Sequence, residues 1–141
     1  MLVGGVAAVV HGSSQFTKDL DVLAEFSVEN LARLQRVLRP LNPRFAIGDH
    51  VPFPTGAEVL SGFKNLDIQT DWGRLDVLGD SPPLPPFAEL SPRSVDVVAF
   101  GITLKVVPVD DLIAVKERVA RPNDLVVVQE LRAAKALRGR A

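Results

Sequence analysis

The chain has 141 residues, of which 47% are hydrophobic and 23% are charged, and its formal net charge is −1. This length and composition predict one folded domain over 1–141 and exclude a wholly disordered chain. The near balance of charges excludes a globally basic surface for nucleic acid, and the lack of cysteine excludes disulfides and thiolate metal sites. No apolar stretch is long enough to span a membrane, so we expect a cytoplasmic protein with no membrane partner.

The first part of the chain alternates short apolar segments with polar loops. The expected elements are a strand over 1–3, a helix over 6–11, a loop over 12–18, a strand over 19–25, a helix over 28–39, a brief strand over 44–47 and a helical turn over 57–60 within the Pro- and Gly-rich segment 48–62. Ser27 is the expected N-cap of the second helix. The first strand is shorter than most strands and is expected to be truncated.

The second part predicts two hairpins followed by two helices. Strands are expected over 64–70 and 74–78, joined by Asp71-Trp72-Gly73, and over 94–99 and 102–107; the helices are expected over 109–119 and from Pro122 to about Leu137. The segment SPPLPP, 81–86, predicts a stiff surface loop. Interleaved helices and strands with two hairpins predict an α/β (α+β) protein with a mixed β-sheet and helices packed on it.

Two aspartates flank one leucine at the start of the strand expected over 19–25. Because strand side chains alternate, Asp19 and Asp21 should lie on one face and Leu20 on the other. Two adjacent carboxylates repel each other unless a cation lies between them. The pair therefore indicates a metal site, although Asp-x-Asp at a strand start is also common in solvated turns.

The pattern as a whole resembles the nucleotidyltransferase-fold superfamily of the DNA polymerase β type. It is most similar to the small bacterial abortive-infection toxin and minimal nucleotidyltransferase groups. The residues that carry the resemblance are Gly4-Gly5, His11-Gly12-Ser13-Ser14, the segment Thr17 to Asp21, the segment Gln69 to Leu78 with Asp76 at its centre, and the segment Asp110 to Asp124. This resemblance extends over nearly the whole chain and implies a single nucleotidyltransferase-fold domain.

The resemblance also implies which residues form the site. One or two Mg²⁺ ions would be held by Asp19, Asp21 and Asp76, which with Lys116 would be the catalytic residues; Gly4, Gly5, Ser13, Ser14, Lys116 and Asp124 would bind the nucleotide. Arg121 resembles an arginine that the family pairs with the later aspartate. Relatives commonly carry an arginine where this chain has Gln15 or Phe16.

The function that follows is Mg²⁺-dependent transfer of a nucleoside monophosphate from an NTP to an acceptor. The acceptor is left open among RNA such as tRNA, protein and a small molecule, and the resemblance connects the chain with toxin–antitoxin or defence systems and a cognate toxin or antitoxin partner. The alternatives are a non-catalytic module of the same fold that acts as an antitoxin or binds a partner, and a structural domain whose aspartates lie on the surface.

Some residues have competing interpretations. Asp67, between Leu66 and Ile68, is a rival to Asp76 as the third carboxylate. Lys116 also fits a solvated or snorkelling lysine. Asp124 also fits an early-helix carboxylate that the helix dipole favours. His11 is expected to be a packing or capping residue, and Trp72 to be exposed or packed at an edge.

Overall fold

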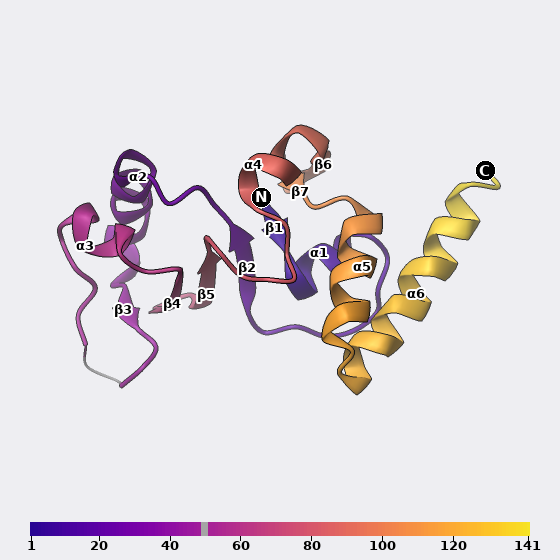
Figure 1. Ribbon diagram of the computed structural model, residues 1–141, viewed down its shortest axis with the longest axis horizontal. Helices are drawn as coiled ribbons and strands as arrows, with labels where there is room; N and C mark the ends of the chain where they lie inside the picture. Colours follow the sequence, from indigo (N-terminus) through magenta and orange to yellow (C-terminus); the bar gives the residue numbers. More distant parts are fainter. Residues whose placement is uncertain (49–50) are drawn as a thin grey trace.

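The computed structural model describes residues 1–48 and 51–141, which form a seven-stranded mixed sheet with six α-helices packed on it (Figure 1). The strand order is β3-β4-β5-β2-β1-β7-β6. The pairs β2·β5 and β1·β7 are parallel, and the other neighbouring pairs are antiparallel. The α+β class with a mixed sheet is confirmed.

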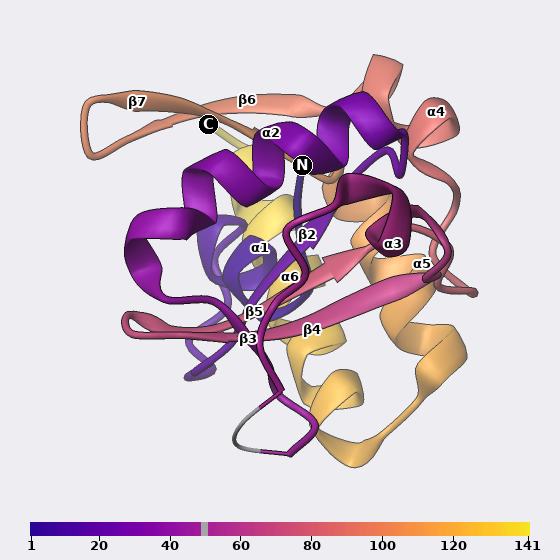
Figure 2. The same ribbon diagram turned by 90° about the vertical axis from the view of Figure 1, so that its left-hand side faces the viewer.

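The strands occupy both halves of the chain. They are β1 (Leu2–Val3), β2 (Leu20–Leu23), β3 (Arg44–Phe45), β4 (Asn65–Thr70), β5 (Gly73–Leu78), β6 (Val95–Ala99) and β7 (Ile102–Val106). The predicted hairpins β4–β5 and β6–β7 both form. Figure 2 shows β6 and β7 at the edge of the sheet, with their turn projecting from the molecule.

The helices cover both faces of the sheet. They are α1 (Gly4–Val10), α2 (Val28–Leu38), α3 (Ala57–Ser61), α4 (Phe87–Leu90), α5 (Val109–Val119) and α6 (Pro122–Arg138), with two 3-10 turns at Arg39–Leu41 and Ser91–Arg93. The Ser27 side chain accepts a hydrogen bond from the Asn30 amide, as the predicted N-cap of α2. In Figure 1, α2 and α3 lie near β3 and β4, and α5 and α6 lie at the other end of the molecule.

Two hydrophobic cores result from this arrangement. The alternation along β4 and β5 sends Leu66, Ile68 and Val77 into a core with α2 and α3. The alternate residues of the same strands, Asp67 and Asp76, therefore point to the opposite face. A second and larger core joins β1 and β7 to α1, α4, α5 and α6. The carboxylates thus emerge on the face that α1, α5 and α6 flank.

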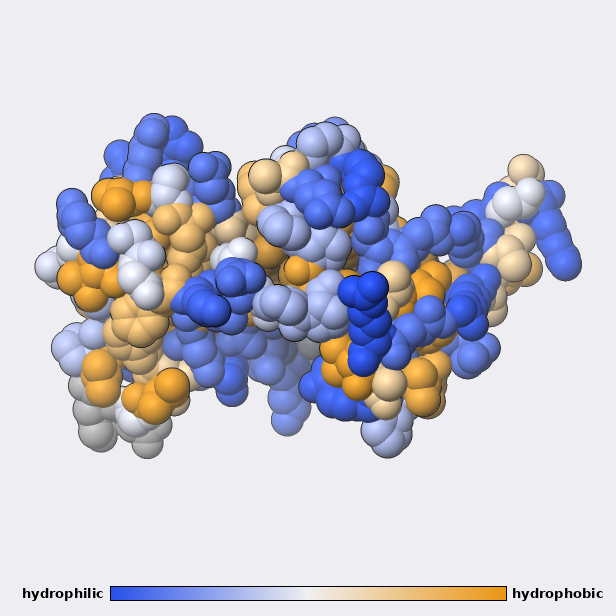
Figure 3. Space-filling view, viewed as in Figure 1, coloured by the Kyte–Doolittle hydropathy of each residue, from blue (hydrophilic) through white to orange (hydrophobic). Residues whose placement is uncertain are grey.

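The surface in the view of Figure 1 is mainly hydrophilic between two hydrophobic patches (Figure 3). The patch at the lower right lies over the turn between α5 and α6, where Val119, Leu125 and Val126 are exposed. Among the described residues, no helix is long and apolar enough to cross a membrane.

Two boundaries near the aspartates differ from the prediction, and one helix was not predicted. Helix α1 begins at Gly4, two residues early, because Gly4 adopts φ +63 and lets the chain pass directly from β1 into the helix. Strand β2 begins at Leu20, so Asp19 precedes the strand; the ladder with β5 starts at the Leu20–Leu75 pair. Helix α4 was not predicted at all.

The remaining expectations for local structure agree with the described residues. The helical turn expected over 57–60 is α3, and the segment 81–86 contains no helix or strand. Within the loop expected over 48–62, residues 49–50 lie outside the described part of the chain.

Candidate functional site

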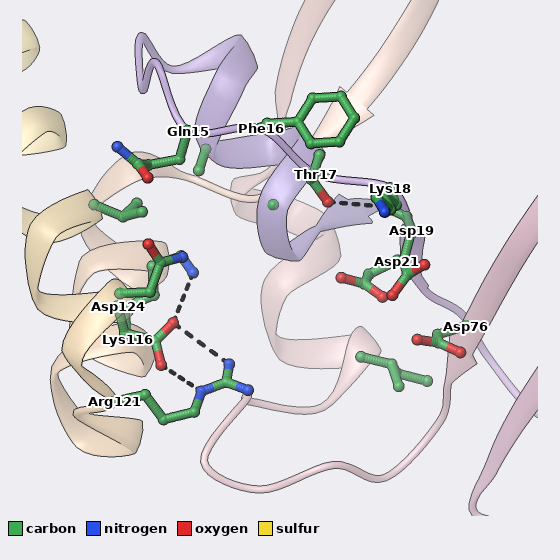
Figure 4. A pocket seen from close by; sticks show the side chains of 15 residues that line it. Gln15, Phe16, Thr17, Lys18, Asp19, Asp21, Asp76, Lys116, Arg121 and Asp124 are labelled. Carbon is green, nitrogen blue, oxygen red and sulfur yellow. Dashed lines mark hydrogen bonds and ion pairs between the residues drawn. The ribbon is translucent and has the colours of Figure 1, made fainter.

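The parallel pairing of β2 with β5 brings two of the predicted aspartates together. Asp21 lies directly opposite Asp76 in the register, so their side chains leave the same face of the sheet. Asp19 lies just before β2 and lines the same cavity. Figure 4 shows the carboxylates of all three residues directed toward a common space. The structure therefore brings together the three residues predicted to hold metal.

The rival carboxylate, Asp67, lies one strand further out on the same face. It is opposite Asp76 in the β4–β5 register, and both of its oxygens accept hydrogen bonds from Arg74, at 2.9 and 2.5 Å. The Arg74 Nε atom is also 3.6 Å from Asp76 Oδ1. Asp67 thus has a bidentate partner, and it does not line the cavity that Asp19, Asp21 and Asp76 share.

The Asp76 carboxyl group lacks the partners that a buried anion needs. Its Oδ1 atom is buried and has no hydrogen-bond partner among the described residues. Burial, followed by the neighbouring carboxylates of Asp67 and Asp21, raises the pKa of Asp76 to about 7. Ionised carboxylates on either side can only accept hydrogen bonds. Arg74, 3.6 Å away and shared with Asp67, is the cation nearest to Oδ1 among the ion pairs of the described residues, so a proton or a further cation would favour the group.

Asp21 shares this environment to a lesser degree. Burial raises its pKa, and the charge of Asp19 acts in the same direction. Hydrogen bonding with Asp76 and from the Gly5 N–H, together with the positive charge of Lys116, opposes the shift. Both Asp21 and Asp76 therefore retain a proton more readily than an exposed aspartate does.

The three carboxylates form one wall of a cavity of about 680 Å³. The opposite wall comes from α5 and α6 and contains Lys116, Arg121 and Asp124 (Figure 4). The loop from α1 to β2 closes a third side with Gln15, Phe16, Thr17 and Lys18. Anionic and cationic groups thus face each other across one open space.

A buried ion cluster holds α5 against the start of α6. Asp124 is 3% exposed; it accepts a hydrogen bond of 3.0 Å from Lys116 and one of 2.7 Å from Arg121. Burial alone would raise the pKa of Asp124, but these two cations lower it, so the carboxylate stays ionised. The solvated interpretation of Lys116 is wrong, because only 12% of its side chain is exposed. Asp124 does lie in the first turn of α6, as its alternative interpretation expects, and it is also paired with Lys116.

Gly4 and Gly5 allow side chains of the site to lie close to the backbone, because glycine has no side chain of its own. A Cβ atom on Gly4 would lie 2.1 Å from Asp21 Oδ2, and one on Gly5 would lie 2.7 Å from Thr17 Oγ1. Both positions thus need glycine for close approach, and Gly5 lines the cavity.

The predicted nucleotide ligands Ser13 and Ser14 have another partner in the structure. Each hydroxyl donates a hydrogen bond of 2.6 Å to Glu130 on α6, and the Ser14 amide donates a third at 3.2 Å. These bonds hold the pKa of Glu130 at about 2. The two serines are therefore bound to α6 and do not line the cavity of the aspartates.

Two residues with minor predicted roles lie apart from the carboxylates. His11 is buried, and its Nε2 atom is 2.7 Å from the Val107 carbonyl, consistent with a packing role. Trp72 is exposed at the turn of the β4–β5 hairpin, as expected.

Sequence reasoning missed Arg74 and Glu130. Arg74 precedes Asp76 by two residues on one strand, so the strand period could have placed both on one face. No sequence signal indicated Glu130, because its role depends on how α6 packs against the loop before β2.

As the side chains are placed, the site offers a pair of carboxylates as metal ligands and no group of three within the described residues. Within 1–48 and 51–141, no group of three or more His, Cys, Asp or Glu side chains is arranged to hold a metal ion. Asp21 and Asp76 nevertheless lie opposite each other in the β2–β5 register, and the buried Oδ1 of Asp76 has no hydrogen-bond partner among the described residues. Mg²⁺ in proteins is usually bound by one or two carboxylates, with waters and substrate phosphates as its other ligands, so this oxygen-only pair fits that ion.

No protein-family model matches the chain, and no curated protein matches it.

Replacing Gly4 should disturb Asp21 as well as strain the backbone. Gly4→Ala forces a side chain into a positive φ and places Cβ against the Asp21 carboxylate. Gly101→Ala is the matched control, since Gly101 has φ +75 and open space around its Cβ position. The control should lose about 1–2 kcal/mol of unfolding free energy from backbone strain, and Gly4→Ala about 1 kcal/mol more. Urea unfolding measures both, and equal losses would contradict the contact with Asp21.

The raised pKa of Asp76 predicts a pH-dependent cost to the folded state. Between about pH 4 and 7 the folded protein retains a proton at Asp76 that the unfolded chain releases, so this group lowers the free energy of unfolding as pH rises. Asp76→Asn removes the effect, so without added metal its stability relative to wild type should rise from pH 4 to 7.5, by at most about 4 kcal/mol.

Urea unfolding at several pH values tests this prediction for Asp76. Asp80→Asn, which changes an exposed carboxylate beside Lys64, controls for the loss of one charge. A pH-independent difference between Asp76→Asn and wild type would show that Asp76 is not protonated in the folded state at neutral pH.

The two cations of the buried cluster should contribute unequally to stability. Lys116→Met removes a partner of Asp124 whose side chain is 12% exposed, and Arg121→Met removes a partner whose side chain is 74% exposed. Loss of a buried partner costs about 3 kcal/mol, and loss of an exposed one about 1 kcal/mol or less. Thermal or urea unfolding of both variants would contradict this if Arg121→Met were the more damaging.

Proposed function

We propose that this protein is a Mg²⁺-dependent nucleotidyltransferase that moves a nucleoside monophosphate from an NTP to an acceptor. The observation that carries the proposal is the Asp21–Asp76 pair, in register on parallel strands, with a buried oxygen that has no hydrogen-bond partner within the described residues. The pair faces Lys116 and Arg121 across the cavity. Such a cavity suits a ligand that brings a cation to the aspartates and phosphates to the basic side chains.

Asp19, Asp21 and Asp76 would hold the metal. Bound there, one or two Mg²⁺ ions would neutralise charge on the phosphates and orient them for in-line displacement. The loss of repulsion between Asp21 and Asp76 would add to the affinity for the ion.

The chain's own residues can bind and orient the triphosphate. The Lys116 ammonium has three donors, of which Asp124 uses one at 3.0 Å, so two remain for phosphate oxygens. Arg121 and Lys18 line the same cavity and add positive charge near its mouth. Asp124 holds Lys116 and Arg121 in position, and its lowered pKa keeps that support at neutral pH.

Asp76 can also move a proton. Its carboxylate would accept the proton of an acceptor hydroxyl that is brought within hydrogen-bond distance of it. The acceptor hydroxyl would have to reach Asp76 at the open side of the cavity. RNA such as tRNA, a protein and a small molecule all offer that group, and a toxin–antitoxin or defence role is the setting we propose.

A second candidate function is that of a module with the same site that binds a partner without catalysis, as an antitoxin does. The turn of the β6–β7 hairpin favours it, because Val98, Phe100 and Ile102 are exposed on an edge hairpin of the sheet. Exposed apolar groups of this kind are typical of protein-binding surfaces.

Nucleotide binding should depend on Mg²⁺ and on the aspartate pair. Titration calorimetry with ATP should give strong binding with Mg²⁺ and at least tenfold weaker binding in EDTA. Asp19→Asn combined with Asp21→Asn should abolish the Mg²⁺-dependent part, as should Asp76→Asn, whereas Asp67→Asn should retain most of it because Asp67 is bound to Arg74. Equal affinity with and without Mg²⁺ would exclude the metal site.

Labelled NTPs incubated with the protein, tRNA and a protein pool separate the two candidate functions. An enzyme labels an acceptor in wild type but not in Asp76→Asn. A binding module retains Mg²⁺-dependent binding of ATP and labels nothing.

A further inference from the structure

Phe16 is an exposed aromatic side chain at the border of the cavity. Its exposed fraction is 83%, and it lines the same space as Asp19, Asp21 and Lys116. Figure 4 shows its ring on the loop before β2, above Thr17 and the carboxylates. An exposed phenylalanine alone needs no explanation. The location of Phe16 beside a charged cavity does need an explanation.

The residues on either side of Phe16 are anchored by hydrogen bonds, although its ring is exposed. On one side, the Gln15 amide donates to Ser13 Oγ at 3.2 Å, and the Ser13 hydroxyl binds Glu130 of α6. On the other side, the Thr17 hydroxyl donates to the Asp19 carbonyl at 3.2 Å. Thr17 also packs so closely on Gly5 that a Cβ there would clash. Because both neighbours are anchored, the backbone at Phe16 loses little further conformational freedom when the ring contacts a ligand.

The surroundings of Phe16 are charged on one side and include apolar side chains on the other. Toward α5 and α6 lies the charged cavity. Toward α1 lies a shallower hollow of about 470 Å³, to which Val6 and Val9 contribute apolar side chains. The ring thus marks the border between a region suited to phosphates and metal and a region suited to an apolar or aromatic group.

We propose that Phe16 is the stacking platform for the nucleobase of the nucleotide that this cavity binds. The inference rests on the proposed function and adds to it the residue that recognises the base. With the phosphates at Lys116 and Arg121 and the metal at the aspartates, the base extends to the Phe16 ring at the cavity border. Stacking on an aromatic face is open to every base, so Phe16 supplies affinity for nucleosides without selecting among them.

The test compares a ligand that has a base with one that has none. Calorimetry with Mg²⁺ measures the affinities of wild type, Phe16→Leu and Phe16→Tyr for ATP and for inorganic tripolyphosphate. Phe16→Leu should weaken ATP binding about 10-fold and leave tripolyphosphate binding unchanged, and Phe16→Tyr should retain wild-type affinity for both. Phe100→Leu is the matched control, since Phe100 is fully exposed on the β6–β7 hairpin and does not line the cavity.

Each contrary result has a distinct meaning. Unchanged ATP affinity in Phe16→Leu would overturn the inference and assign the ring to another role, such as contact with a partner protein. An equal loss for ATP and tripolyphosphate would also overturn it, since the ring would then act only on the shape of the loop. If wild type binds neither ligand with Mg²⁺, the proposed function fails, and the inference fails with it.

Discussion

The register between β2 and β5 is the constraint on which the candidate site depends. Parallel neighbours in a sheet lie about 4.8 Å apart, and the ladder fixes which residues are opposite each other. Because Asp21 is opposite Asp76, their carboxyl groups are held close by the backbone, whatever their side chains do. The hydrogen bonds of the sheet thus keep the two carboxyl groups close although they repel each other when both are ionised. The same hydrogen bonds contribute to the stability of the whole domain. Burial raises the pKa of both residues, and for Asp76 the proximity of Asp67 and Asp21 adds to the rise.

One face of the sheet carries a hydrophobic core, and the other face carries the candidate site. On one face, apolar residues of β4 and β5 pack under α2 and α3, and this core contains no ionisable side chain. On the other face, the same strands present Asp67 and Asp76, and the cavity opens toward α5 and α6. Lys116, Arg121 and Asp124 hold those two helices together at the point where they border the cavity. Residues that support the packing of α5 on α6 are therefore also the ones that supply positive charge.

Local patterns in the sequence were sufficient to predict most of the elements and the members of the aspartate set. The period of two predicted the face of Asp21, and the hairpin signal around Gly73 located the strand of Asp76. The family resemblance favoured Asp76, but the alternation alone left Asp67 as a rival, because both lie on the same face of one hairpin. Their difference is a long-range property: Asp76 has β2 as its neighbour, and Asp67 has Arg74 as its partner. The assignment of Ser13 and Ser14 was uncertain for the same reason, since Glu130 is more than a hundred residues away along the chain.

The contact between Ser13 and Glu130 joins positions separated by 117 residues. The loop that carries Phe16 is thereby fastened to a helix near the end of the described chain, and α6 itself forms part of the cavity wall. Contacts of such sequence separation form late, because a long loop must close before they can be made. During synthesis the sheet and the aspartates can therefore assemble before the cavity has all its walls. The protein gains a complete pocket only when α6 has left the ribosome and docked.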